Sequence, residues 1–134
     1  MKFLLRFLLL SSALFLAHVC LAADEVSLPI GNIEIPSEKI TTEDAQKAIM
    51  RALNNRKWTI REESADRVVA YLRRHTNEAQ ITFVITGRTI EISCWGYDIN
   101  RNTGERKKPE LPASWIKYIK ADLSRFLNEV AMLK

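Results

Sequence analysis

Between residues 58 and 95 the chain alternates apolar and polar side chains in four successive runs, separated by short polar turns. Alternation with a period of two is typical of strands that bury one face of a sheet. The turns are too short for the crossover that parallel strands need. The four runs therefore predict an antiparallel meander. Its buried face would carry Ile60, Leu72, Ile81, Phe83 and Ile92.

Apolar residues recur with helical spacing on both sides of this meander. After a capping threonine, Thr41 or Thr42, the first stripe consists of Ala45, Ala48, Ile49, Ala52 and Leu53. A second stripe follows Ser114 and runs from Ile116 to Val130. An amphipathic helix and a half-apolar sheet can bury each other's apolar surface. We expect an α+β two-layer sandwich, a four-stranded antiparallel meander with two helices packed on one face, in the order α-β-β-β-β-α.

The N-terminus has the three zones of a secretory signal peptide. Lys2 and Arg6 precede an uncharged, mostly apolar stretch, and small residues follow at Ala22 and Ala23. The apolar stretch is shorter than the roughly 20 residues that a membrane-spanning helix needs. The pattern predicts a signal peptide over residues 1–22, cleavage near Ala22 or Ala23, and a periplasmic or secreted protein without a transmembrane segment. In the alternative, Cys20 is lipidated, although Val19 before it is larger than the usual small residue.

The rest of the chain predicts one domain behind a short arm. Residues 23–40 contain Pro29, Gly31 and Pro36 and are expected to form an extended lead-in, with a short edge strand around Ile33. Residues 41–134 are expected to form a single α+β domain.

The charge and the cysteine content of the chain argue against a nucleic-acid partner and against an internal disulfide. The whole chain has 20 basic and 16 acidic residues, and the net charge falls from +4 to about +2 without Lys2 and Arg6. This balance, together with export, argues against a nucleic-acid partner. Beyond the signal peptide only Cys94 remains, so no internal disulfide is expected, and Cys94 should pack as a small buried hydrophobe.

The sequence offers few residues for catalysis. Beyond the signal peptide, the only histidine is His75. It is expected in an exposed turn, where no neighbouring residues would hold it in a catalytic triad. Glu62, Glu63 and Asp66 are expected to be solvated around another turn. The chain has no glycine-rich phosphate loop and no cluster of metal ligands. We therefore expect a protein that is not an enzyme, with no catalytic residues, no metal and no cofactor.

Some features resemble a family of small exported bacterial proteins, many of them lipoproteins, that have no established biochemical activity. The shared features are a helix ending before a tryptophan strand at 53–58, the segment Ala70-Tyr71-Leu72, and the pair Trp115-Ile116. The resemblance covers about residues 42–130 and implies an α-β-β-β-β-α domain and export, but no function. This chain departs at residues 109–114, where members tend to carry an Asn-Tyr-Asn-like segment.

The helix-free face of the meander is the candidate binding surface. Tight turns would place Tyr71, Gln80 and Trp95 in one cross-strand row, and Arg73, Glu78 and Tyr97 in the next. Tyrosine, tryptophan and arginine are enriched at binding hot spots. The same aromatic rows can instead serve only to stabilise the sheet, or the N-terminal arm can cover them. The predicted site consists of Tyr71, Trp95, Arg73, Gln80 and Tyr97.

These observations favour a non-enzymatic binding or accessory module of the cell envelope. Its expected partner is an envelope protein or a glycan, and a homodimer through the same face is an alternative. A second hypothesis is an inhibitor or immunity-type protein that acts on a secreted enzyme through the loop at 98–113. Arg106 to Lys108 form a basic tip in that loop, which we expect to be solvated, although it could also contact an anionic envelope component.

Overall fold

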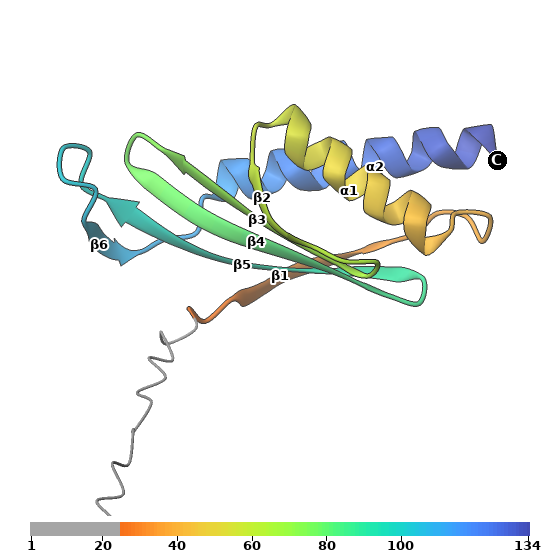
Figure 1. Ribbon diagram of the computed structural model, residues 1–134, viewed down its shortest axis with the longest axis horizontal. Coiled ribbons are helices and arrows are strands. Elements are labelled where there is room, and N and C mark those ends of the chain that lie inside the picture. The colour runs from red at the N-terminus through yellow and green to blue at the C-terminus, as the bar shows by residue number, and fades with distance from the viewer. Residues whose placement is uncertain (1–24) are drawn as a thin grey trace, which may run out of the picture.

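The computed structural model describes residues 25–134, which form an α+β fold with one mostly antiparallel sheet and two helices (Figure 1). The expected α+β class is confirmed. The predicted signal peptide and Cys20 lie outside the described residues. In chain order the elements are β1 (Leu28–Glu34), α1 (Thr42–Asn55), β2 (Thr59–Glu63), β3 (Arg67–Arg74), β4 (Asn77–Thr86), β5 (Thr89–Ile99), β6 (Arg106–Pro109) and α2 (Ala113–Leu133).

The sheet has six strands, so the predicted count of four was wrong. The strand order is β1-β5-β4-β3-β2, and β6 pairs with the end of β5 that lies beyond β1. The predicted meander corresponds to β2 to β5. The sequence carries only a weak signal for β1, the short edge strand expected around Ile33, since β1 contains Pro29 and Gly31 and has an irregular register between them. It gave none for β6, whose residues are all exposed and do not alternate.

The strand registers agree with those predicted from the turns. Tyr71 pairs with Gln80, and Gln80 pairs with Trp95. In the adjacent row Glu78 pairs with both Arg73 and Tyr97. Because side chains of paired residues point to the same face, each row projects from one side of the sheet.

Both helices lie on the same side of the sheet, where they cover the main core (Figure 1). Leu72, Ile81, Phe83 and Ile92 are buried there, whereas Ile60 on the edge strand β2 is only partly buried. Cys94 is fully buried in this core, and burial raises the pKa of its thiol to about 12. The thiol is therefore neutral at physiological pH, as expected of a cysteine that packs as a hydrophobe.

Polar contacts fix the ends of α1. At its start the side chain of Thr41 accepts a hydrogen bond from the Asp44 amide, and the Asp44 carboxylate accepts one from the Thr41 amide. This capping box satisfies two amides that the helix itself leaves unpaired. Near its other end, Asn55 and Arg56 donate to the buried carboxylate of Asp122 on α2. The hydrogen bond from Arg56 is the main cause that lowers the pKa of Asp122.

Gly96 lies where β5 passes under the segment that leads into α2. The Glu110 amide donates to the Gly96 carbonyl over 2.9 Å. A methyl group at position 96 would lie 2.5 Å from the Glu110 carbonyl oxygen and 2.9 Å from Pro112. Backbone cannot yield to such a contact as a flexible side chain can, so this close approach requires glycine.

We predict that Gly96→Ala lowers the free energy of unfolding by about 1–3 kcal/mol, because the added methyl group overpacks a fixed backbone contact. Urea unfolding of the purified protein measures this change. Ser93→Ala on the same strand is the control and should change stability by less than about 0.5 kcal/mol. Equal stabilities of Gly96→Ala and the wild type would contradict the close approach.

Candidate functional site

The candidate site is the sheet face opposite the helices, which neither α1 nor α2 covers (Figure 1). Val69 and Trp95 on this face are 4% and 7% exposed, and Ile99 near it is fully buried. None of the three belongs to the core cluster under the helices. This side of the sheet therefore has apolar packing of its own, separate from the main core.

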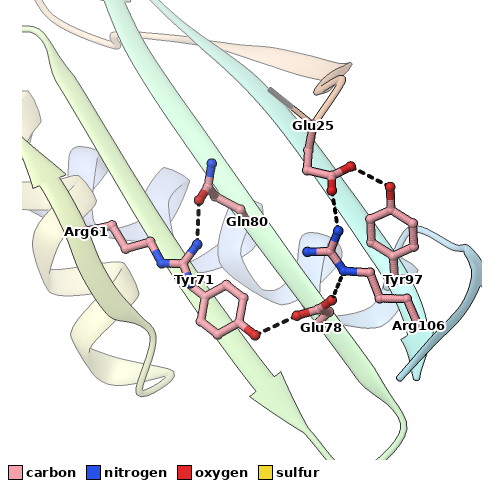
Figure 2. Close-up of polar contacts among 7 residues, drawn as sticks. All are labelled: Glu25, Arg61, Tyr71, Glu78, Gln80, Tyr97 and Arg106. Atoms are coloured by element: carbon pink, nitrogen blue, oxygen red, sulfur yellow. Dashed lines mark hydrogen bonds and ion pairs between the residues drawn. The ribbon is translucent and has the colours of Figure 1, made fainter. Parts of the chain in front are cut away.

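A buried carboxylate, that of Glu78 near the start of β4, lies on this face between Tyr71 and Arg106 (Figure 2). Glu78 is 8% exposed. The Tyr71 hydroxyl donates to its Oε2 over 2.6 Å, and the Arg106 guanidinium donates to its Oε1. A buried carboxylate is tolerated only when such partners replace the water that it loses. Both carboxylate oxygens of Glu78 therefore have a hydrogen-bond donor, one from β3 and one from β6.

Arg106 covers the Trp95 half of the face. Its guanidinium carbon lies 5.0 Å from the centre of the Trp95 ring and 4.3 Å from that of the Tyr97 ring. It also donates to Glu25, which accepts a further hydrogen bond from the Tyr97 hydroxyl (Figure 2). These bonds, that of Tyr97 first, lower the pKa of the Glu25 carboxyl. Ion pairing and cation–π contact thus hold β6 and the start of the described chain against Trp95.

Tyr71 and Arg61 form the other half of the face. Arg61 follows the core-facing Ile60, so alternation directs it to this side of the sheet, at a register irregularity between Ile60 and Glu62. The Arg61 guanidinium carbon lies 3.7 Å from the centre of the Tyr71 ring, and Nη1 donates to Gln80 Oε1 over 2.8 Å (Figure 2). Tyr71 is half-buried and Arg61 is exposed. An arginine stacked on a tyrosine is thus held at the surface by a defined hydrogen bond.

The five predicted site residues project from one face but differ in accessibility. Trp95 is buried, so it is not the exposed stacking platform that its sequence position suggested. Tyr71, Gln80 and Tyr97 are half-buried, and Arg73 is exposed. The rings of Tyr71 and Trp95 are 6.3 Å apart, and those of Trp95 and Tyr97 are 5.8 Å apart.

Sequence reasoning missed three contributors to this face: Arg61, Arg106 and Glu25. Arg61 alternates with the core-facing Ile60 and so belongs to this face, but the sequence did not indicate its contacts with Tyr71 and Gln80. Arg106 belongs to the tip that we expected to be solvated, but it lies in β6 and reaches Trp95. Glu25 belongs to the lead-in. The sequence indicated such a contact only through the alternative that the N-terminal arm covers the aromatic residues.

The residues considered for catalysis are exposed and lie in turns or on the edge strand β2. His75 occupies the turn after β3 with a positive φ of 50° and is exposed. Glu62 is exposed and lies 3.4 Å from Arg67. Across residues 25–134, no three His, Cys, Asp or Glu side chains converge in a way that could hold a metal ion.

Comparisons with protein-family models, with curated proteins and with solved structures found no match to this chain. The resemblance to small exported bacterial proteins therefore stays a prediction. Neither helix within residues 25–134 is long and apolar enough to cross a membrane.

We predict that Glu78→Gln lowers the free energy of unfolding by about 1–3 kcal/mol, because it leaves the Arg106 and Tyr71 donors with a poorer acceptor. Chemical denaturation measures the change. Glu91→Gln is the matched control on the same face, since Glu91 is exposed, and should change stability by less than about 0.5 kcal/mol. Equal effects of the two substitutions would show that Glu78 has no special role.

The phenols of Tyr71 and Tyr97 should ionise only above pH 10. Burial, followed by the hydrogen bond to Glu78, raises the pKa of Tyr71 above its usual 10.0. The hydrogen bond to Glu25 is the main cause that raises the pKa of Tyr97 above the same value. Because the folded state favours the neutral phenols, their contribution to stability is complete below pH 10 and lost as pH rises through the raised values.

Absorbance titration of phenolate formation tests this prediction. Tyr71→Phe/Tyr97→Phe should remove a component that titrates above pH 10, and Glu78→Gln should shift the Tyr71 component to lower pH. Glu91→Gln should leave the titration unchanged. If the component lost in the double variant titrates at or below pH 10, the hydrogen bonds of the two phenols are not as described.

Proposed function

We propose that this chain is an exported cell-envelope protein that acts as a non-enzymatic binding module, and that it contacts an acidic protein partner through the sheet face around Tyr71. In this proposal residues 1–22 direct export and are cleaved near Ala22 or Ala23, with lipidation of Cys20 as the alternative route to the envelope. The observation that carries the binding proposal is the exposed arginine pair, Arg61 and Arg73, next to Tyr71.

The two arginines leave positive charge on this part of the face. Arg106 is paired with Glu25 and Glu78, whereas neither Arg61 nor Arg73 forms an ion pair with any residue in 25–134. Arg61 is nevertheless ordered by Gln80 and by the Tyr71 ring. A guanidinium that is already oriented loses little side-chain entropy when it binds a carboxylate.

A protein partner fits this surface better than a single small molecule. Tyrosine and arginine are the residues that most often dominate protein interfaces, where they form flat, rigid anchors. Bidentate pairing with carboxylates would use the planar guanidinium groups of Arg61 and Arg73. The partner should therefore present Asp or Glu side chains around an apolar or aromatic contact for Tyr71.

Crosslinking in intact cells, followed by mass spectrometry, tests the proposal. Arg61→Glu/Arg73→Glu should reduce capture of an acidic envelope protein by about tenfold or more, since hot-spot arginines contribute roughly 2 kcal/mol or more each. Both side chains are exposed, so the fold should tolerate the change. Binding of the purified partner should also weaken as salt increases.

The control is Lys117→Glu, a charge reversal at an exposed position on α2. It should leave capture of the same partner unchanged. Capture that is equal in the wild type and the double variant would overturn the assignment of the face. Capture of only a second copy of this chain would indicate a homodimer instead.

The inhibitor hypothesis has one supporting observation, an ordered turn between β5 and β6. The Asn100 side chain accepts hydrogen bonds from the amides of Asn102 and Thr103, over 2.8 and 3.1 Å. Arg101, Asn102 and Thr103 are exposed at the tip. If Arg101→Ala/Thr103→Ala abolishes partner capture and the Arg61/Arg73 reversal does not, the turn is the binding element.

A further inference from the structure

A separate pocket of about 250 Å³ lies between the end of α1, strand β3 and the first turns of α2. Its walls include Trp58, Leu72 and Trp115. Leu72 and Trp58 belong to the core cluster under the helices, and Trp115 packs against that cluster. The pocket is therefore distinct from the face around Tyr71 and is not used by the proposed partner contact.

The pocket has aromatic walls. Trp58 is 4% exposed, and its ring meets that of Trp115 edge to face, with centroids 6.0 Å apart and an angle of 85°. Tyr118, one turn further along α2, also lines the pocket and is 50% exposed. The pocket therefore offers ring faces and edges to a flat ligand.

Two arginines line the pocket, of which Arg56 is paired with Asp122 and Arg74 supplies the positive charge. Arg56 is oriented by the buried carboxylate of Asp122, over 2.8 Å from Nε to Oδ2, and lies 4.9 Å from the centre of the Tyr118 ring. Arg74, at the end of β3, is exposed and forms no ion pair with the described part of the chain. The pocket lining contains no Asp or Glu.

The remaining polar lining also suits a negatively charged group. Ser114, in the first turn of α2, contributes to the pocket wall. That first turn contains no acidic residue, and the N-cap Pro112 makes no side-chain hydrogen bond. A carboxylate beside Arg74 and Ser114 would therefore meet donors and positive charge without a competing acid.

We propose that this pocket binds a small aromatic carboxylate, with its ring against Trp115 and Tyr118 and its carboxylate at Arg74. Pockets for drug-sized ligands usually measure roughly 300–1,000 Å³. The smaller volume here, about 250 Å³, limits the ligand to about one ring with a short acidic group. This site is independent of the proposed protein partner.

Binding of benzoate to the purified protein, followed by NMR of the tryptophan indole N–H signals, tests the inference. The chain has three tryptophans, and Trp95 on the opposite face serves as an internal control. Benzoate should shift the Trp58 and Trp115 signals saturably, with a dissociation constant below about 1 mM, and leave Trp95 unchanged. Benzamide, which has the same ring without the charge, should bind at least fivefold more weakly.

Arg74→Gln should weaken benzoate binding at least fivefold while the indole signals of the free protein stay dispersed as in the folded wild type. The matched control is Lys117→Gln, which removes a positive charge from α2 outside the pocket lining and should leave the affinity unchanged. The proposal is overturned by unsaturable shifts, by equal shifts at Trp95, by equal binding of benzamide, or by an unaffected Arg74→Gln variant.

Discussion

The carboxylate of Glu78 constrains the sheet face that the helices leave uncovered. A charge on an open sheet face normally stays in water, but Glu78 is 8% exposed. It therefore needs donors from the protein, and it has them in the Tyr71 hydroxyl and the Arg106 guanidinium. Because Arg106 is also stacked on Trp95 and bonded to Glu25, one buried charge links β3, β4, β6 and the start of the described chain.

This arrangement divides the face into two unequal halves. On the Trp95 half, the charged groups and the aromatic rings already contact one another, so few groups remain free to bind a partner. On the Tyr71 half, Arg61 and Arg73 retain exposed positive charge, and Arg61 is held by the Tyr71 ring and Gln80. The main core on the other side of the sheet does not depend on this network, since its buried cluster contains neither Glu78 nor Trp95. The side chains of the proposed binding surface thus lie outside the main core.

Much of the fold was predictable because it follows from periodicity. Alternation and tight turns determined the registers that place Tyr71 beside Gln80 and Trp95, and helical spacing located both helices. Strand β1 was expected only as a short edge strand around Ile33, because an irregularity near Gly31 interrupts it, and β6 was missed because it has no buried face. Edge strands pair through their backbones, so the pattern of apolar and polar side chains in the sequence predicts such pairing poorly.

The candidate site was predictable only in part, for a related reason. Registers identified which residues share a face, but accessibility depends on residues distant in sequence. Trp95 is covered by Arg106 from β6, and Tyr97 is bonded to Glu25, 72 positions away. Likewise, the pocket between Trp58 and Trp115 arises where the ends of three elements meet, and no local pattern indicates it.

The most direct test of the central claim is hydroxyl-radical footprinting of the protein, both purified and in intact cells. We expect Trp95 to be protected in both states, because Arg106 covers it, and Met132, which is 86% exposed on α2, to be modified in both. Tyr71 should be modified in the purified protein and protected in cells by the proposed partner. Equal modification of Tyr71 in the two states would contradict the proposal that this face binds a partner.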